Sequence, residues 1–99
     1  MLYVILGTDA PDSYERRLGA RPIHLDYVRW LQNAGRLIIA GPLPSIDSTD
    51  PGPAGVTGSL IIGEFPSREA AKKWAAADPY TLARVYEPIT IRPLIGVRL

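Results

Sequence analysis

The residue of this chain best suited to moving a proton is His24, its only histidine. It lies three and four residues before Tyr27 and Val28, on the apolar side of a helix predicted over residues 22–34, with Pro22 in the first helical position. In a first helical turn the positive end of the helix dipole opposes a charged imidazole, so the spacing indicates a neutral ring that can accept a proton. The competing interpretation is a histidine at the edge of the core, with its ring nitrogens bonded to backbone or water.

Two charged residues stand at predicted helix junctions, where they could meet this histidine. Asp78 precedes Pro79, and Arg21 precedes Pro22. A carboxylate beside His24 would orient one ring nitrogen and stabilise the imidazolium, and an arginine would bind an anionic oxygen. Each residue also has an ordinary role, because aspartate before proline is a common N-cap and arginine near a helix start is commonly solvated. Convergence of the three would make a site for proton transfer.

Ser59, at the start of a predicted strand, is a further candidate for binding negative charge that develops on a substrate. It does not stand in the nucleophile motif G-x-S-x-G, and the only histidine is already assigned, so serine hydrolysis is not indicated. Tyr27 and Trp30 are predicted to be packing residues and not ligand contacts.

Charge and composition exclude several classes of partner and cofactor. The 99 residues include 11 basic and 10 acidic side chains scattered along the chain, which leaves no basic patch for nucleic acid. Without cysteine and with one histidine, the chain lacks the ligands of disulfide, thiolate and multi-histidine metal sites. No glycine-rich segment has the lysine and the strand-to-helix setting of a phosphate loop, so neither ATP nor NAD is indicated. We therefore do not expect a metal centre, a nucleotide cofactor or a nucleic-acid partner.

The first six residues are apolar, but the run is far too short to cross a membrane and no basic segment leads it. We expect a strand there, a single domain over residues 1–99, no membrane contact and a cytoplasmic location.

The elements that must position these residues follow from hydrophobic periodicity and from turn residues. Ser67 is placed to cap a second helix, and Asp78 to cap a short helical piece that begins at Pro79. A long loop is expected over residues 45–58. The predicted strands are residues 2–6, 36–40, 59–65 and about 86–93. The order β-α-β-β-α-β is that of a ferredoxin-like α+β fold, a four-stranded antiparallel sheet with helices on one face.

The second face of such a sheet needs a cover. The strands over residues 36–40 and 59–65 are nearly continuous in leucine, isoleucine and alanine, without a clean polar alternation. This pattern indicates burial on both sides, and since the helices cover only one, we predict a homodimer.

The ordered set of motifs resembles the YciI-like family over nearly the whole chain. The segments that carry the resemblance are Arg21-Pro22-x-His24, Ala40-Gly41-Pro42-Leu43, Gly58-Ser59-Leu60 and Ala77-Asp78-Pro79-Tyr80. The resemblance implies a ferredoxin-like domain that pairs sheet to sheet as a dimeric α/β barrel. It also implies an active site at His24 and Asp78, in a cleft near the dimer interface. The chemistry associated with the family is lyase-like, a dehydrochlorination of a chlorinated hydroxyquinol, and related barrels include muconolactone isomerases.

Two hypotheses follow. In the first, the chain is a small cofactor-independent enzyme in which His24 takes a proton, Asp78 orients the imidazole, and Arg21 and Ser59 bind the substrate. In the second, the same cleft binds a small ligand or a partner enzyme without turnover. RNA binding on the sheet would need exposed aromatic residues on the central strands, which these strands lack.

Overall fold

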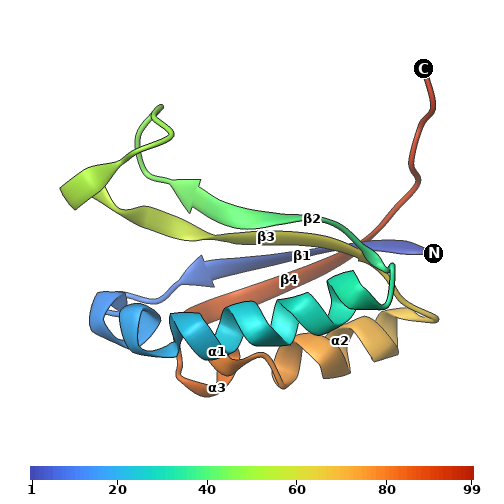
Figure 1. Ribbon diagram of the computed structural model, residues 1–99, viewed down its shortest axis with the longest axis horizontal. Helices are drawn as coiled ribbons and strands as arrows, with labels where there is room; N and C mark the ends of the chain where they lie inside the picture. The colour runs from blue at the N-terminus through green and yellow to red at the C-terminus, as the bar shows by residue number, and fades with distance from the viewer.

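Four strands form one antiparallel sheet in the order β2-β3-β1-β4, and the α-helices lie together on one face of it (Figure 1). The computed structural model describes residues 1–99. In chain order the elements are β1 (Leu2–Asp9), α1 (Tyr14–Asn33), β2 (Leu37–Pro44), the 3-10 helix η1 (Gly52–Ala54), β3 (Val56–Glu64), α2 (Arg68–Ala76), α3 (Pro79–Leu82) and β4 (Tyr86–Leu94). The predicted α+β, ferredoxin-like architecture is confirmed.

A hydrophobic core fills the space between the sheet and the helices. Ile5 of β1 pairs with Ile61 of β3 on one side and with Ile91 of β4 on the other, and all three are buried. Val28 and Leu31 of α1 pack onto them as part of the same cluster. The alternation of buried residues along β1 is what places one set of side chains under the helices.

The first helix begins eight residues earlier than predicted, at Tyr14, so Pro22 lies inside α1 and does not open it. Proline is disfavoured there because it has no N–H to donate to the carbonyl of Leu18. Tertiary contacts hold the early turns in place. The side chain of Arg16 donates to the carbonyls of Asp12 and Arg84.

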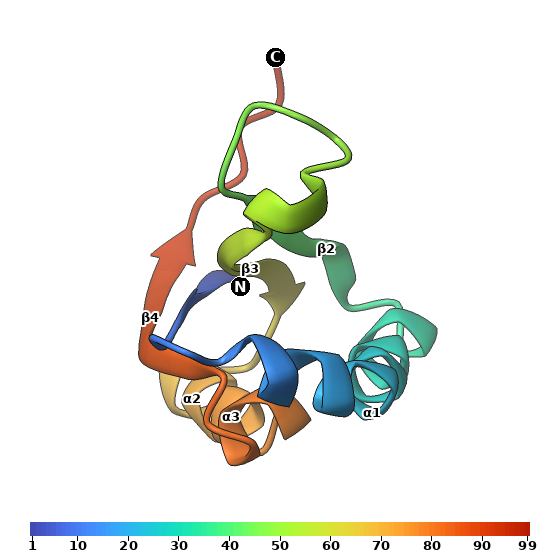
Figure 2. The ribbon, with the colours of Figure 1, turned by 90° about the vertical axis from the view of Figure 1, so that its left-hand side faces the viewer.

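The second strand also runs further than predicted. Gly41 and Pro42 lie within β2, which continues to Pro44. Proline is tolerated because β2 is at the edge of the sheet. The β2–β3 connection is accordingly shorter than the predicted loop, and Ser45 closes it through contacts with the carbonyls of Ala54 and Gly55. It lies at the end of the sheet away from the two chain termini (Figures 1 and 2).

Both predicted caps are confirmed. The side chain of Ser67 accepts a hydrogen bond from the Ala70 amide at 3.1 Å, and Asp78 accepts one from the Tyr80 amide at 2.9 Å. The prediction that Tyr27 packs is also confirmed, because it stacks on the Trp74 ring.

The same prediction is wrong for Trp30, whose exposed fraction is 78%. Trp30 lies one residue before the buried Leu31, and adjacent helical residues point about 100° apart, so only one of the two can face the core.

The opposite face of the sheet carries no α-helix (Figure 2). Val4 pairs with Ile62, which pairs with Ile39, and Leu6 pairs with Leu60, so a continuous apolar surface crosses three strands. Ile39 is exposed, and the other four side chains are only partly covered.

None of the helices combines the length and the apolar character that a membrane-spanning segment needs.

Candidate functional site

The side chains of His24 and Asp78 meet between α1 and the start of α3. The His24 Nδ1 atom lies 2.7 Å from Asp78 Oδ1, and the two side chains are only 8% and 2% exposed. The same carboxylate oxygen accepts the Tyr80 amide hydrogen. Asp78 therefore caps α3 and contacts His24 through the same oxygen, so one residue fills both of its expected roles.

The imidazole of His24 is oriented on two sides. Its ring stacks on the ring of Tyr80 with the centroids 3.8 Å apart and the planes 13° apart. With Nδ1 facing Asp78, the opposite nitrogen, Nε2, has no hydrogen-bond partner in the protein and is not sealed from solvent. His24 thus presents one free nitrogen to the cavity that it helps to line.

One premise about this histidine is wrong. His24 was expected in the first turn of a helix, where the dipole would oppose its charged form. Because α1 begins at Tyr14, His24 lies in the middle of the helix, beyond the reach of the terminal dipole. Its environment is set by Asp78 and Tyr80.

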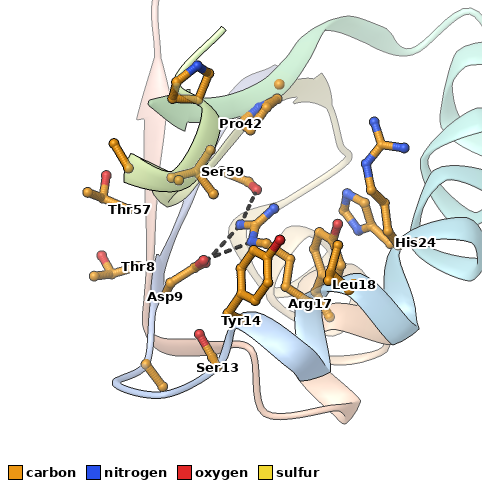
Figure 3. Close-up of a pocket in the computed structure, with 18 of the residues that line it drawn as sticks. Thr8, Asp9, Ser13, Tyr14, Arg17, Leu18, His24, Pro42, Thr57 and Ser59 are labelled. Atoms are coloured by element: carbon orange, nitrogen blue, oxygen red, sulfur yellow. Dashed lines mark hydrogen bonds and ion pairs between the residues drawn. The ribbon is translucent and has the colours of Figure 1, made fainter. Parts of the chain in front are cut away.

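A cavity of about 980 Å³ opens beside His24, between α1, strands β1, β2 and β3, and the segment that carries η1 (Figure 3). One wall is helical and carries the basic side chains, and another is formed by the β2–β3 connection. Its lining includes Thr8, Asp9, Ser13, Tyr14, Arg17, Arg21, His24, Pro42, Gly52, Pro53, Thr57, Ser59 and Tyr80.

Arg17 is the most constrained polar side chain in this cavity. Its Nε and Nη2 atoms each donate to one carboxylate oxygen of Asp9 at 2.8 Å, and Nη2 also donates to Ser59 Oγ at 2.8 Å (Figure 3). Its Cζ atom lies 4.6 Å from the centroid of the Tyr80 ring. Burial lowers the pKa of Arg17, but the hydrogen bond and charge of Asp9 raise it, and the net shift is upward. The guanidinium is therefore charged and fixed in position.

The other two predicted substrate-binding residues differ in setting. Arg21 lines the cavity but is exposed. It forms no hydrogen bond or ion pair with the rest of the protein, and so none with His24 or Asp78. Ser59 is buried, and its hydroxyl accepts a hydrogen bond from Arg17.

Comparison with known proteins agrees with the fold described above. The model of the YCII-related domain family matches residues 1–95. The chain belongs to this family. Protein YciI of Escherichia coli O6:H1 is 55% identical to this YCII-related chain over 93 residues, which cover 94% of the chain and 95% of that protein. An uncharacterised protein of Haemophilus influenzae is 46% identical over the same length, with the same coverage.

Two solved structures share the fold. One is 5-chloro-2-hydroxyhydroquinone dehydrochlorinase (TftG) from Burkholderia phenoliruptrix, in complex with 2,5-dihydroxybenzoquinone. Its TM-score is 0.85 at 26% identity, covering 98% of this chain and 96% of that one. The other, an antibiotic biosynthesis monooxygenase, has a TM-score of 0.50 at 19% identity over 99% of this chain and all of that one, which shows the fold alone.

Sequence reasoning about this YCII-related chain missed Arg17 and its partner Asp9. The signal was present, because Arg17 lies seven residues, or two helical turns, before His24 and so shares its face. The expected helix start at Pro22 placed Arg17 outside this helix, so the shared face was not recognised. No three histidine, aspartate or glutamate side chains gather in the way that a metal site requires.

Tyr86 supports the site from behind. Its ring meets the edge of Tyr80, with the centroids 5.5 Å apart, and lies against the backbone of Gly7, where an added Cβ would come within 2.5 Å of it. The Tyr86 hydroxyl is buried without a well-formed hydrogen bond. Burial raises its pKa strongly, and the nearby Ser59 hydroxyl lowers it by less. Gly7 and Tyr86 together hold the ring on which His24 stacks.

Proposed function

We propose that this chain, as a single YCII-related domain over residues 1–99, is a small cofactor-independent enzyme that transfers a proton on a small aromatic or lactone-like molecule. The observation that carries the proposal is the 2.7 Å contact between His24 Nδ1 and Asp78, which leaves Nε2 open to the cavity. A general base needs this arrangement, with one nitrogen held and the other free to reach the substrate.

In the proposed mechanism, His24 Nε2 takes a proton from a hydroxyl or an activated carbon of the substrate. Asp78 accepts the Nδ1 hydrogen, so that the lone pair stays on Nε2, and its negative charge stabilises the imidazolium that forms. The Tyr80 ring keeps the imidazole plane in one orientation. His24 then returns the proton to a carbon of the product, as in an isomerase, or to solvent when a leaving group departs, as in a lyase.

The substrate class rests on the cavity and on one relative. A cavity of about 980 Å³ suits a small molecule, at the upper end of the usual range of ligand sites. TftG, which shares the fold over nearly the whole chain, is a dehydrochlorinase of a chlorinated hydroxyhydroquinone. A hydroxylated ring is the substrate class that these observations favour.

Arg21 and Ser59 are proposed to bind the substrate. Arg21 stands at the cavity with its charge unpaired and can attract a substrate oxygen that carries negative charge. The Ser59 hydroxyl accepts from Arg17 and retains its own hydrogen, which it can donate to a ligand.

The test is a turnover screen of catechols, hydroxyquinols, their chlorinated forms and small lactones, with the wild-type protein and His24→Gln. A general base contributes about 10²- to 10⁴-fold in rate, so the variant should lose that much activity on a true substrate. Turnover that His24→Gln retains would contradict the proposal. Saturable binding without turnover would favour a ligand-binding module.

We also propose that the chain works as a homodimer through the apolar face of the sheet. Its support is the uncovered surface formed by Val4, Ile39 and Ile62 with their neighbours. At micromolar concentration, light scattering of the wild-type protein should give twice the mass of one chain. The Ile62→Lys variant should give the mass of a single chain. Ile23→Lys, on the exposed side of α1, is the matched control. A wild-type monomer would contradict the proposal.

A further inference from the structure

We infer that the mouth of the cavity binds an apolar substituent of the substrate, so that the ligand has a polar head at His24 and an alkyl or aryl extension toward solvent. This ligand class rests on the proposed function for its head. For its extension it rests on three apolar side chains of α1, none of which is among the predicted substrate-binding residues.

Helix α1 presents two rows of side chains to the cavity. Arg17 and His24 are buried and lie about two helical turns apart, so they form one row. Leu18 and Leu25 follow them directly in the chain and form a second row about 100° further round the helix. Tyr14 continues the second row one turn before Leu18. Tyr14, Leu18 and Leu25 thus form an apolar rim beside the buried polar row.

The apolar rim is exposed to solvent. The exposed fractions are 63% for Tyr14, 50% for Leu18 and 37% for Leu25. Single exposed apolar side chains are common on protein surfaces, but a row of them along a cavity is typical of a ligand-binding groove. The apolar sheet face that we propose for the dimer lies on the side of the sheet away from α1 (Figure 2), so a sheet-to-sheet contact leaves the rim uncovered.

The wall across the cavity from the apolar rim is also mainly apolar. It is lined by Pro42 of β2, Ala54 of η1 and Val56 of β3. Figure 3 shows Pro42 on the sheet side of the cavity, with Tyr14 and Leu18 on the helix side. An apolar group that lies between these two walls is covered on both sides.

The two exposed charged side chains at the mouth do not oppose such a group. Asp12 and Arg21 both line the cavity, and their charges stay hydrated when an apolar group binds beside them. Arg21 stands three residues after Leu18 and four before Leu25, on the same side of the helix. Its methylene stem can lie along the substituent while its guanidinium stays free.

The size of the cavity agrees with a ligand of this shape. Its volume of about 980 Å³ is at the upper end of the range of sites that bury drug-sized molecules. A single hydroxylated ring at His24 therefore leaves much of the cavity unfilled. A substituent that runs from His24 to the apolar rim fills more of it and removes the Leu18 and Leu25 side chains from water.

The experiment measures how affinity depends on the length of the apolar part. 4-Methyl-, 4-ethyl-, 4-propyl- and 4-butylcatechol are titrated calorimetrically into the wild type, Leu18→Gln and Ile23→Gln. Each CH₂ group that leaves water for the rim should lower the dissociation constant about threefold, which makes about 30-fold from methyl to butyl. γ-Butyrolactones with the same four alkyl groups should show the same gain, because the rim does not contact the head.

The variants locate the chain. Leu18→Gln should reduce the gain to about 10-fold or less, because an amide replaces the apolar side chain in the middle of the rim while glutamine keeps the helix. Ile23→Gln is the matched control and should keep the full gain. Ile23 is 63% exposed on the same helix but does not line the cavity.

Three results would overturn the inference. The first is a wild-type affinity that does not rise with chain length. The second is an equal gain in Leu18→Gln and the wild type, which would place the chains elsewhere, such as on the apolar face of the sheet. The third is failure of both series to bind at millimolar concentration.

His24→Gln separates the apolar site from the proposed function. The variant loses the base but keeps the rim, so the gain with chain length should persist in it. A gain without turnover that depends on His24 would contradict the proposed function alone. Turnover that depends on His24, without a gain, would contradict the apolar site alone.

Discussion

The two halves of helix α1 pack against the same sheet in opposite ways. The C-terminal half contributes Val28 and Leu31 to a core that contains only apolar and aromatic side chains. The stretch from the start of the helix to its midpoint buries Arg17 and His24, and a cavity lies beside them. Each of these buried polar groups is oriented by a carboxylate. The helix packs onto the sheet through an apolar core at one end, which stabilises the fold, and leaves a cavity at the other, where the proposed proton transfer would take place.

The strongest way to sharpen this contrast is His24→Gln. We expect turnover of a true substrate to fall about 10²- to 10⁴-fold, while the midpoint of urea unfolding changes little. The midpoint should change little because the side-chain amide of Gln can still donate a hydrogen bond to the buried Asp78 carboxylate. A variant that loses both stability and activity would mean that His24 is a structural residue.

The converse change is Leu31→Ala, at the closed end. Leu31 is buried within the apolar cluster, and its truncation should lower the free energy of unfolding by about 2–5 kcal/mol. The folded fraction should turn over a true substrate as the wild type does. Trp30→Ala, at the exposed neighbouring position, should change stability by about 0.5 kcal/mol or less. Equal losses for the two variants would contradict the packing described above.

A third prediction separates the two roles of Asp78. Asp78→Asn keeps an oxygen that can cap the Tyr80 amide and accept from His24, but it removes the negative charge. Turnover should therefore fall about 10- to 100-fold. Ser is also a good cap but is too short to reach His24. Thermal unfolding should show Asp78→Asn within about 1 kcal/mol of wild type, whereas Asp78→Ser leaves the buried Nδ1 of His24 without its partner and should lose about 1–3 kcal/mol. Full activity of Asp78→Ser would reduce Asp78 to a helix cap.

The smallest expected effect concerns Tyr86, behind the site. Burial raises the pKa of Tyr86 in the folded protein, so above pH 10 the unfolded chain releases a proton that the folded chain retains. Stability that is fully present below pH 10 should therefore decline as the pH rises above it. In Tyr86→Phe that decline should be smaller, as measured by urea unfolding from pH 8 to 11. At neutral pH the variant should lose little stability, because the hydroxyl has no partner to lose.

Much of the fold was predictable because its pattern is local. Short apolar runs bounded by turn residues predict the strands, and Ser67 and Asp78 mark the starts of α2 and α3 where they are observed. The errors fell at prolines. Pro22 and Pro42 were interpreted as boundaries, but long-range contacts and an edge position in the sheet accommodate them. Local propensity is a weak force compared with tertiary packing.

The site divides in the same way. The sequence alone determined that this chain has one histidine on an inward helical face and one aspartate at a helix start, since residue type and helical spacing are enough for that. Only the tertiary structure decided that they lie 2.7 Å apart, that Tyr80 stacks on the histidine, and that Arg17 is fixed by Asp9 and Ser59. These contacts join residues up to 56 positions apart in the chain. The packing of the helices onto the sheet sets such distances, and no local spacing encodes them.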